Sequence, residues 1–138
     1  MPMTEAAATP IDDSIICFEE GVIGVPRARR FELLDRPGSS IRILRCLDIE
    51  GFCLPVVDPL LADPEYHPAI GSRVAETLEL QADEPALLLA VTSLEPDGPV
   101  ANLRAPVIVN VRRRVAAQVI LEDRRYPLRA RVAQPVTT

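Results

Sequence analysis

Prolines interrupt this sequence at short intervals, with 14 among its 138 residues. That is about twice the usual frequency in soluble proteins. Proline is excluded from helix interiors and from the middle of central strands, because it has no amide hydrogen and its ring fixes φ. The chain must therefore be built from many short elements that are joined by turns.

The segments between these breaks are apolar, of strand length and mostly rich in valine, isoleucine and leucine. They predict strands at 14–18, 31–34, 41–47, 52–57, 86–94, 105–111 and 115–122. The stretch 87–91 is apolar throughout, which predicts a central strand. One short helix is predicted at 72–78, with Ser72 placed to cap it. The pattern predicts an all-β fold, a small antiparallel β-barrel-like domain with at most one short helix.

The length fits a single domain. Residues 1–10 are small and polar, and are expected to form a flexible N-terminal tail or a weak edge strand. The barrel domain is expected to span 11–132, followed by a flexible C-terminal tail at 133–138. Within the domain, prolines punctuate the run 58–68, which predicts an extended surface loop.

The chain is acidic, with a formal net charge of −5 and a pI near 4.9. Nucleic-acid-binding domains usually carry a basic excess, so we expect no direct nucleic-acid ligand and favour a basic protein as partner. No signal-peptide pattern is present, and no apolar run is long enough to span a bilayer. These features predict a cytoplasmic protein without membrane contact.

Catalytic and metal-binding motifs are missing from the sequence. The three cysteines have no CxxC spacing and there is one histidine, so we expect neither a metal nor another cofactor. Adjacent carboxylates such as Glu122 and Asp123 would point to opposite faces of a strand. We therefore expect no enzymatic activity, which would require a strongly raised carboxyl pKa at Glu19, Glu122 or Asp123. The Gly21 and Gly24 pair is expected to form turns with positive φ.

Two apolar segments joined by the basic run 112–114 predict a hairpin. Pro106 lies inside its first strand, which indicates a sheet edge or a bulge. Asn102 and Asn110 bracket that strand, and each could cap the backbone at a strand end or contact a partner. Arg104 lies between them, where its guanidinium would suit a carboxylate or a C-terminal peptide.

Five motifs follow one another along the chain: Phe18–Gly24 with Phe31–Leu34 after it, Val56–Pro59, Pro64–Pro68, Asn102–Asn110 and Gln118–Leu121. In this order they resemble the family of the flagellar assembly factor FliW. Together they extend over nearly the whole chain, from about residue 11 to residue 126. The resemblance implies a small β-barrel-like cytoplasmic protein without catalysis.

The same resemblance implies two protein partners. The chain is expected to bind and antagonise the translational regulator CsrA, to release it when flagellin competes, and to be monomeric when free. Its acidic charge fits this expectation, because CsrA binds RNA through a basic surface. The candidate contacts lie in the 58–68 loop and the 102–110 segment: Asp58, Pro59, Tyr66, Asn102, Arg104, Pro106 and Asn110. The alternative is a non-flagellar β-barrel that binds another protein, or a small ligand in a closed apolar pocket.

Overall fold

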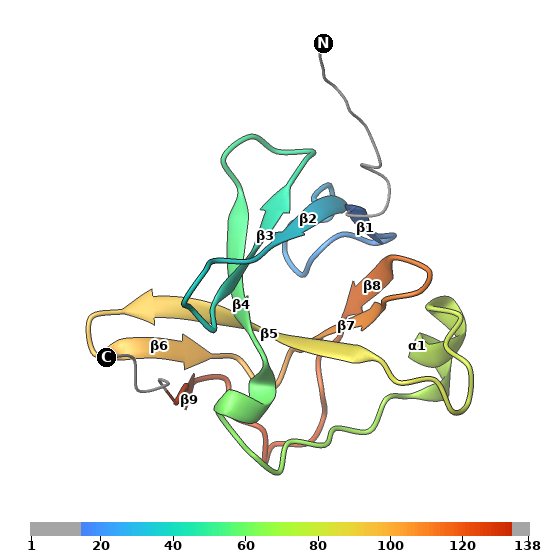
Figure 1. Ribbon diagram of the computed structural model, residues 1–138. Coiled ribbons are helices and arrows are strands. Elements are labelled where there is room, and N and C mark those ends of the chain that lie inside the picture. The colour runs from blue at the N-terminus through green and yellow to red at the C-terminus, as the bar shows by residue number, and fades with distance from the viewer. Residues whose placement is uncertain (1–14, 134–138) are drawn as a thin grey trace.

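The computed structural model describes residues 15–133, which contain nine strands, one α-helix and one 3-10 helix (Figure 1). The strands are β1 (Ile15–Phe18), β2 (Arg30–Leu34), β3 (Arg42–Cys46), β4 (Cys53–Val57), β5 (Leu87–Glu95), β6 (Gly98–Ala101), β7 (Val107–Asn110), β8 (Val115–Gln118) and β9 (Ala130–Arg131). The helices are η2 (Pro59–Leu61) and α1 (Ser72–Thr77). The predicted N-terminal tail, 1–10, lies outside the described residues. The predicted C-terminal tail, 133–138, also lies outside them except for residue 133. Within 15–133, the helices are too short to cross a membrane.

Seven of the described strands close into a barrel, in the order β4-β3-β2-β1-β8-β7-β5, and pairing of β4 with β5 completes the ring. The all-β barrel with one short helix is therefore confirmed. The neighbours are antiparallel with one exception, because β1 and β8 run parallel, with Phe18 opposite Ala116. These two strands come from opposite ends of the domain and are not joined by a hairpin, so nothing forces them to be antiparallel.

The longest strand, β5, takes part in two ladders. Its first three residues pair with β7, Ala90 and Val91 pair with β4, and its last four residues pair with β6. The outer edge of β6 carries β9, so these two strands extend the sheet beyond the barrel (Figure 1). The central position predicted for 87–91 is confirmed, although Leu87, Leu88 and Val91 are only half-buried.

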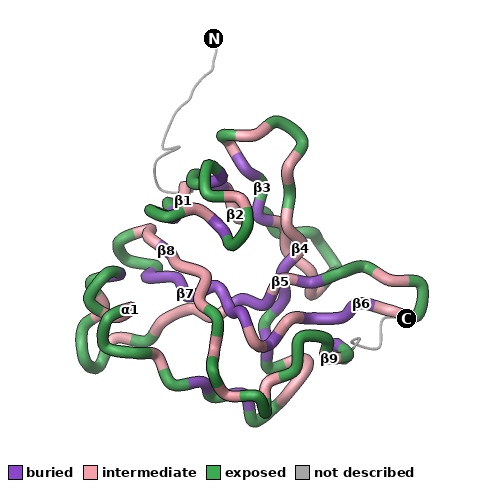
Figure 2. The backbone as a smooth tube through the Cα atoms, turned by 180° about the vertical axis from the view of Figure 1, so that it is seen from behind, coloured by how far each residue is buried: buried purple, intermediate pink, exposed green. Residues whose placement is uncertain are grey.

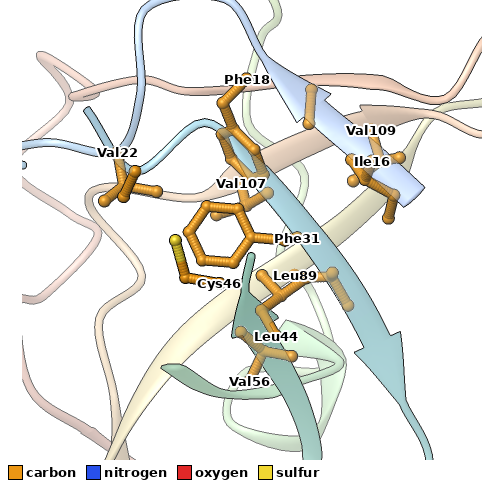
Figure 3. Packing of buried hydrophobic residues seen from close by; sticks show 12 residues of the cluster. Ile16, Phe18, Val22, Phe31, Leu44, Cys46, Val56, Leu89, Val107 and Val109 are labelled. Carbon is orange, nitrogen blue, oxygen red and sulfur yellow. The ribbon is translucent and has the colours of Figure 1, made fainter. Parts of the chain in front are cut away.

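Aromatic and aliphatic side chains fill the barrel interior. Phe18 and Phe31 pack edge to face with ring centroids 5.1 Å apart. Around them lie the buried side chains Ile16, Leu44, Val56, Leu89 and Val107 (Figure 3). A second buried cluster consists of Val57, Tyr66, Ala90, Ala101, Leu103 and Val132. Buried residues concentrate along β6 and β7 (Figure 2), where β7 contributes Val107 and Val109 to the first cluster and β6 contributes Ala101 to the second.

All seven predicted strands are present, but some boundaries, the role of Pro106, the helix cap and one connection differ from the prediction. β7 begins immediately after Pro106 and is paired on both sides, so the proline precedes an interior strand and marks no edge. The helix at 72–77 is confirmed, whereas its N-cap is Gly71 and not Ser72. The 58–68 run is not simply an extended surface loop, because it contains η2 and buries Tyr66.

Candidate functional site

The two stretches that were predicted to contact a partner meet at Tyr66. Its hydroxyl donates a hydrogen bond of 2.7 Å to the carbonyl oxygen of Leu103, which is 37 residues away in the sequence. Both residues are buried, so this bond is shielded from water and fixes the 58–68 loop against the segment before β7. Burial of the phenol raises the pKa of Tyr66 above its ordinary value near 10.

The Arg104 side chain folds onto the protein near Tyr66. Its Nε donates to the carbonyl oxygen of Tyr126 at 2.8 Å. The ring of Tyr126 in turn packs edge to face on Tyr66, with centroids 4.9 Å apart. The Arg104 side chain is only half-buried, and a guanidinium has five N–H donors, so donors remain for a partner after this bond is made.

Asn102 and Asp58 each close a turn through a side-chain oxygen. Oδ1 of Asn102 accepts from the backbone amides of Arg104 and Ala105, at 2.9 and 3.2 Å. Oδ1 of Asp58 accepts from the Leu60 amide at 2.9 Å and caps η2. Asp58 is exposed and Asn102 half-exposed, so both are within reach of another molecule.

Asn110 lies at the far end of β7 and is fully buried. Its Nδ2 donates to the carbonyl oxygens of Leu78 and Glu79, at 2.8 and 3.3 Å. Its Oδ1 accepts from the Arg113 amide at 3.2 Å. The side chain therefore acts as a cap that ties the end of α1 to the β7–β8 hairpin.

Most of the predicted contact residues gather around Tyr66. Asp58, Pro59 and Tyr66 line a cavity of about 360 Å³ beside the start of β5. Pro106 is buried at the start of β7, where its carbonyl oxygen accepts from the Val119 amide at 3.1 Å. Asn110 is the member that lies apart, next to α1.

A second hollow, of about 440 Å³, lies between α1, β8 and the 19–26 turn that follows β1. None of the predicted contact residues lines it. Gly21 and Gly24 adopt positive φ in this turn, as their predicted role requires. Oε1 of Gln118 accepts from the Ile23 amide at 2.9 Å and holds the turn beside β8. Gln118 belongs to a motif that resembles FliW, but only the folded chain places it against Ile23, 95 residues away.

Two carboxylates that pair with arginine, Asp123 and Glu95, do not suit acid–base catalysis. Hydrogen bonds from Arg125 lower the pKa of Asp123 to about 2. Hydrogen bonds from Arg129 likewise lower the pKa of Glu95. Both carboxylates are ionised at neutral pH and cannot serve as proton donors there. Residues 15–133 contain no group of three His, Cys, Asp or Glu side chains placed to hold a metal ion.

We expect Tyr66 to make the fold sensitive to alkali. The unfolded chain releases the phenol proton near pH 10, whereas the folded chain keeps it to higher pH, so the unfolded state binds fewer protons there. The free energy of unfolding should then fall above pH ~10 by up to about 1.4 kcal/mol per pH unit, with no such loss at lower pH. Urea unfolding between roughly pH 8 and 11 measures this slope. It should shrink in Tyr66→Phe, and an unchanged slope would remove Tyr66 as its cause.

Comparison with known proteins decides the family. The model of the FliW protein family matches residues 4–132 of this chain. The chain belongs to the FliW family. The flagellar assembly factor FliW of Thermotoga maritima is 35% identical over 129 residues, which cover 91% of this chain and 87% of that protein. The flagellar assembly factor FliW of Syntrophus aciditrophicus is 32% identical over 122 residues, which cover 86% and 77%.

The FliW fold is shared as well. A crystal structure of the flagellar assembly factor FliW matches with a TM-score of 0.82 at 24% identity, covering 98% of this chain and 93% of that one. The motifs that resemble FliW divide between two structural roles here. Phe18, Phe31 and Val56 build the barrel core, whereas Tyr66 and Gln118 join distant segments by hydrogen bonds.

Proposed function

We propose that this chain is a non-enzymatic, cytoplasmic regulator that acts by binding proteins. It binds and antagonises CsrA, and it releases CsrA when flagellin binds to the chain in competition. The match of the FliW family model to residues 4–132 is the observation that carries the proposal. The relatives are named flagellar assembly factors, which agrees with a role in flagellar assembly. In this role the chain, a monomer when free, controls flagellin translation through the amount of unoccupied CsrA.

Charge supports the antagonism. The chain carries a net charge of −5, whereas a protein that binds the phosphate backbone of RNA presents a basic surface to it. An acidic protein docked beside that surface lowers its positive potential and weakens RNA binding, even where it does not cover the RNA site. This electrostatic part should decline as salt rises, since charges are screened over about 8 Å at physiological ionic strength.

The proposed contact surface is centred on Tyr66. Its accessible members are Asp58, Asn102 and Arg104, which come from the two stretches that the Tyr66–Leu103 hydrogen bond joins. The remaining candidates are buried and hold the backbone in place: Pro59, Tyr66, Pro106 and Asn110. A partner therefore meets a surface whose shape is set before binding, which lowers the entropy cost of association.

We expect Arg104→Glu to weaken CsrA binding by about tenfold or more, because it replaces a guanidinium that is expected to bind a carboxylate of the partner with a side chain that repels one. Asn102→Ala should weaken binding less, since it removes the cap of one turn. Titration calorimetry with purified CsrA measures both affinities. Arg36→Glu is the matched control, because it makes the same charge change at an exposed residue of the 35–39 turn.

The outcomes separate three cases. A large fall in melting temperature with Arg104→Glu would assign Arg104 to the fold, since its lost bond to the Tyr126 carbonyl should cost only about 1 kcal/mol. Affinity unchanged by both substitutions would place the contact elsewhere. If the unmodified chain gives no complex with CsrA at micromolar concentrations, the proposed function itself is wrong.

The alternative, a barrel that encloses a small ligand, has less support. Phe18, Phe31 and Leu44 fill the interior, so a ligand of useful size would have to displace the core. The hollows of about 360 and 440 Å³ are both partly open to solvent. Open hollows of this kind suit a partner segment better than an enclosed small molecule.

A further inference from the structure

One edge of β8 loses its neighbour part-way along the strand. β1 pairs with β8 only as far as Phe18 opposite Ala116. Beyond Phe18 the chain enters the 19–26 turn, which a hydrogen bond from the Ile23 amide to the Gln118 side chain holds beside β8, and then returns to β2. Within residues 15–133, no other strand pairs with this edge. β8 is therefore an interior strand where it begins and an edge strand where it ends.

The unpaired stretch directs backbone hydrogen-bonding groups outward. On the β7 side, the amides of Val119 and Leu121 donate to carbonyl oxygens across the hairpin, at 3.1 and 2.7 Å. Successive residues of a strand face opposite edges, so the amides and carbonyls of Gln118 and Ile120 face the open edge. An extended segment laid along it would find a donor and an acceptor at each of these two residues.

The hollow of about 440 Å³ forms a groove beside this stretch, since residues 115–119 are among those that line it. Val74 of α1 and Leu78, the C-cap of that helix, line it together with Val22 and Ile23 of the turn. Two large apolar side chains stay in contact with solvent here, since Ile23 is 46% exposed and Ile120, just past residues 115–119, is 67% exposed. Apolar walls beside an open strand edge are what a peptide needs when it binds as an added strand.

The charges at the groove favour a basic occupant. Glu19 and Glu20 are exposed in the turn, and Arg73 is exposed on α1. The carboxylates outnumber the guanidinium, and the whole chain has the same negative sign. Lysine or arginine beside the apolar residues of a partner segment would be attracted to this groove, and acidic residues would be repelled.

We propose that the groove beside β8 binds an extended segment of a partner protein, which adds to the open edge as a strand and carries alternating apolar residues together with lysine or arginine. The proposal rests on the proposed function for the expectation that the chain binds proteins, and it adds the mode of binding. A helical segment fits less well, because its backbone groups are satisfied internally and would leave Gln118 and Ile120 unpaired.

Selection from a display library of random peptides about ten residues long, with the full chain as bait, tests the proposal without assuming the partner. Enriched peptides should show apolar residues at alternating positions together with lysine or arginine. Synthetic versions should bind at micromolar affinity and slow amide hydrogen exchange at Gln118 and Ile120 by about tenfold or more. Selection that enriches no peptide of this pattern would overturn the proposal.

Two substitutions locate the bound peptide. Ile120→Lys removes apolar surface at the open edge and adds a charge that repels a basic peptide, so it should weaken peptide binding by about tenfold or more. Leu94→Lys makes a comparable change on β5, away from the groove, where Leu94 is 57% exposed, and should leave affinity within about twofold. Both residues are exposed, so both variants should keep the circular dichroism spectrum of the unmodified chain. Equal effects of the two substitutions, or unprotected amides at Gln118 and Ile120, would contradict strand addition.

The charge of the groove has its own control. Glu19→Lys with Glu20→Lys should weaken binding of a basic peptide. Glu50→Lys with Glu65→Lys makes the same change at exposed residues that do not line the groove, and should weaken that binding less. The two proposals then fail separately. A chain that binds peptides in the groove but not CsrA would refute the proposed function alone, and a chain that binds CsrA but no such peptide would refute strand addition alone.

Discussion

Replacement of Asn110 by alanine is expected to lower the free energy of unfolding by about 3 kcal/mol, a large part of the total for a domain of this size. The substitution leaves the Leu78 carbonyl and the Arg113 amide without their side-chain partner. Asn110 is bonded to two residues with positive φ. Its Nδ2 donates to the carbonyl oxygen of Glu79, which has φ of 57°, and its own carbonyl oxygen accepts from the amide of Arg114, which has φ of 59°. Loss of Asn110 therefore removes bonds where two residues already hold an unfavourable backbone conformation.

Urea unfolding followed by circular dichroism measures this loss. Asn102→Ala is the matched control, because the Asn102 side chain also bonds to the backbone, accepting from two amides, but is only half-buried. Asn102→Ala should lower the free energy of unfolding by about 1 kcal/mol. If Asn110→Ala is no more destabilising than Asn102→Ala, the bridge between α1 and the hairpin does not stabilise the fold as described.

Replacement of Gly21 by alanine is expected to lower the free energy of unfolding by about 4 kcal/mol, through two effects that act together. Gly21 has φ of +74°, which L-residues adopt only with strain. A Cβ at this position would also lie 2.6 Å from the Cα of Pro26, and closer still to the Pro26 carbonyl oxygen. The turn between β1 and β2 would have to open to admit the methyl group.

Gly24 separates these two effects. It has φ of +84°, but a Cβ there would meet no atom within 4 Å. Gly24→Ala should therefore cost only about 1 kcal/mol, from backbone strain alone. Thermal unfolding of the two variants gives the comparison. Equal losses would mean that close approach to Pro26 contributes nothing.

The predictable part of the fold was the part that short-range patterns encode. The apolar segments marked seven strands, because burial on one or both faces leaves a local signature. β6 and β9 left none, since β6 is four residues long with Gly98 and Pro99 at its start, and β9 has two residues. The parallel pairing of β1 with β8 depends on barrel closure, which no local pattern reveals.

The candidate site was predictable in the same limited way. The resemblance to FliW singled out the 58–68 and 102–110 stretches, and the Tyr66–Leu103 bond brings the first of them against the second. Sequence left the asparagines open between capping and partner contact, because that choice depends on burial. The groove beside β8 was missed, since its walls come from residues 19–26, 73–78 and 115–119, which only the folded chain assembles.

The central claim is that this member of the FliW family controls CsrA by partner exchange, and a three-component titration tests it most directly. Fluorescence anisotropy of a labelled flagellin leader RNA reports its complex with CsrA. Adding this chain at micromolar concentration should lower the RNA-bound fraction, and adding flagellin afterwards should restore it. RNA binding that stays unchanged when the chain is added would contradict the claim, and so would a loss of binding that flagellin cannot reverse.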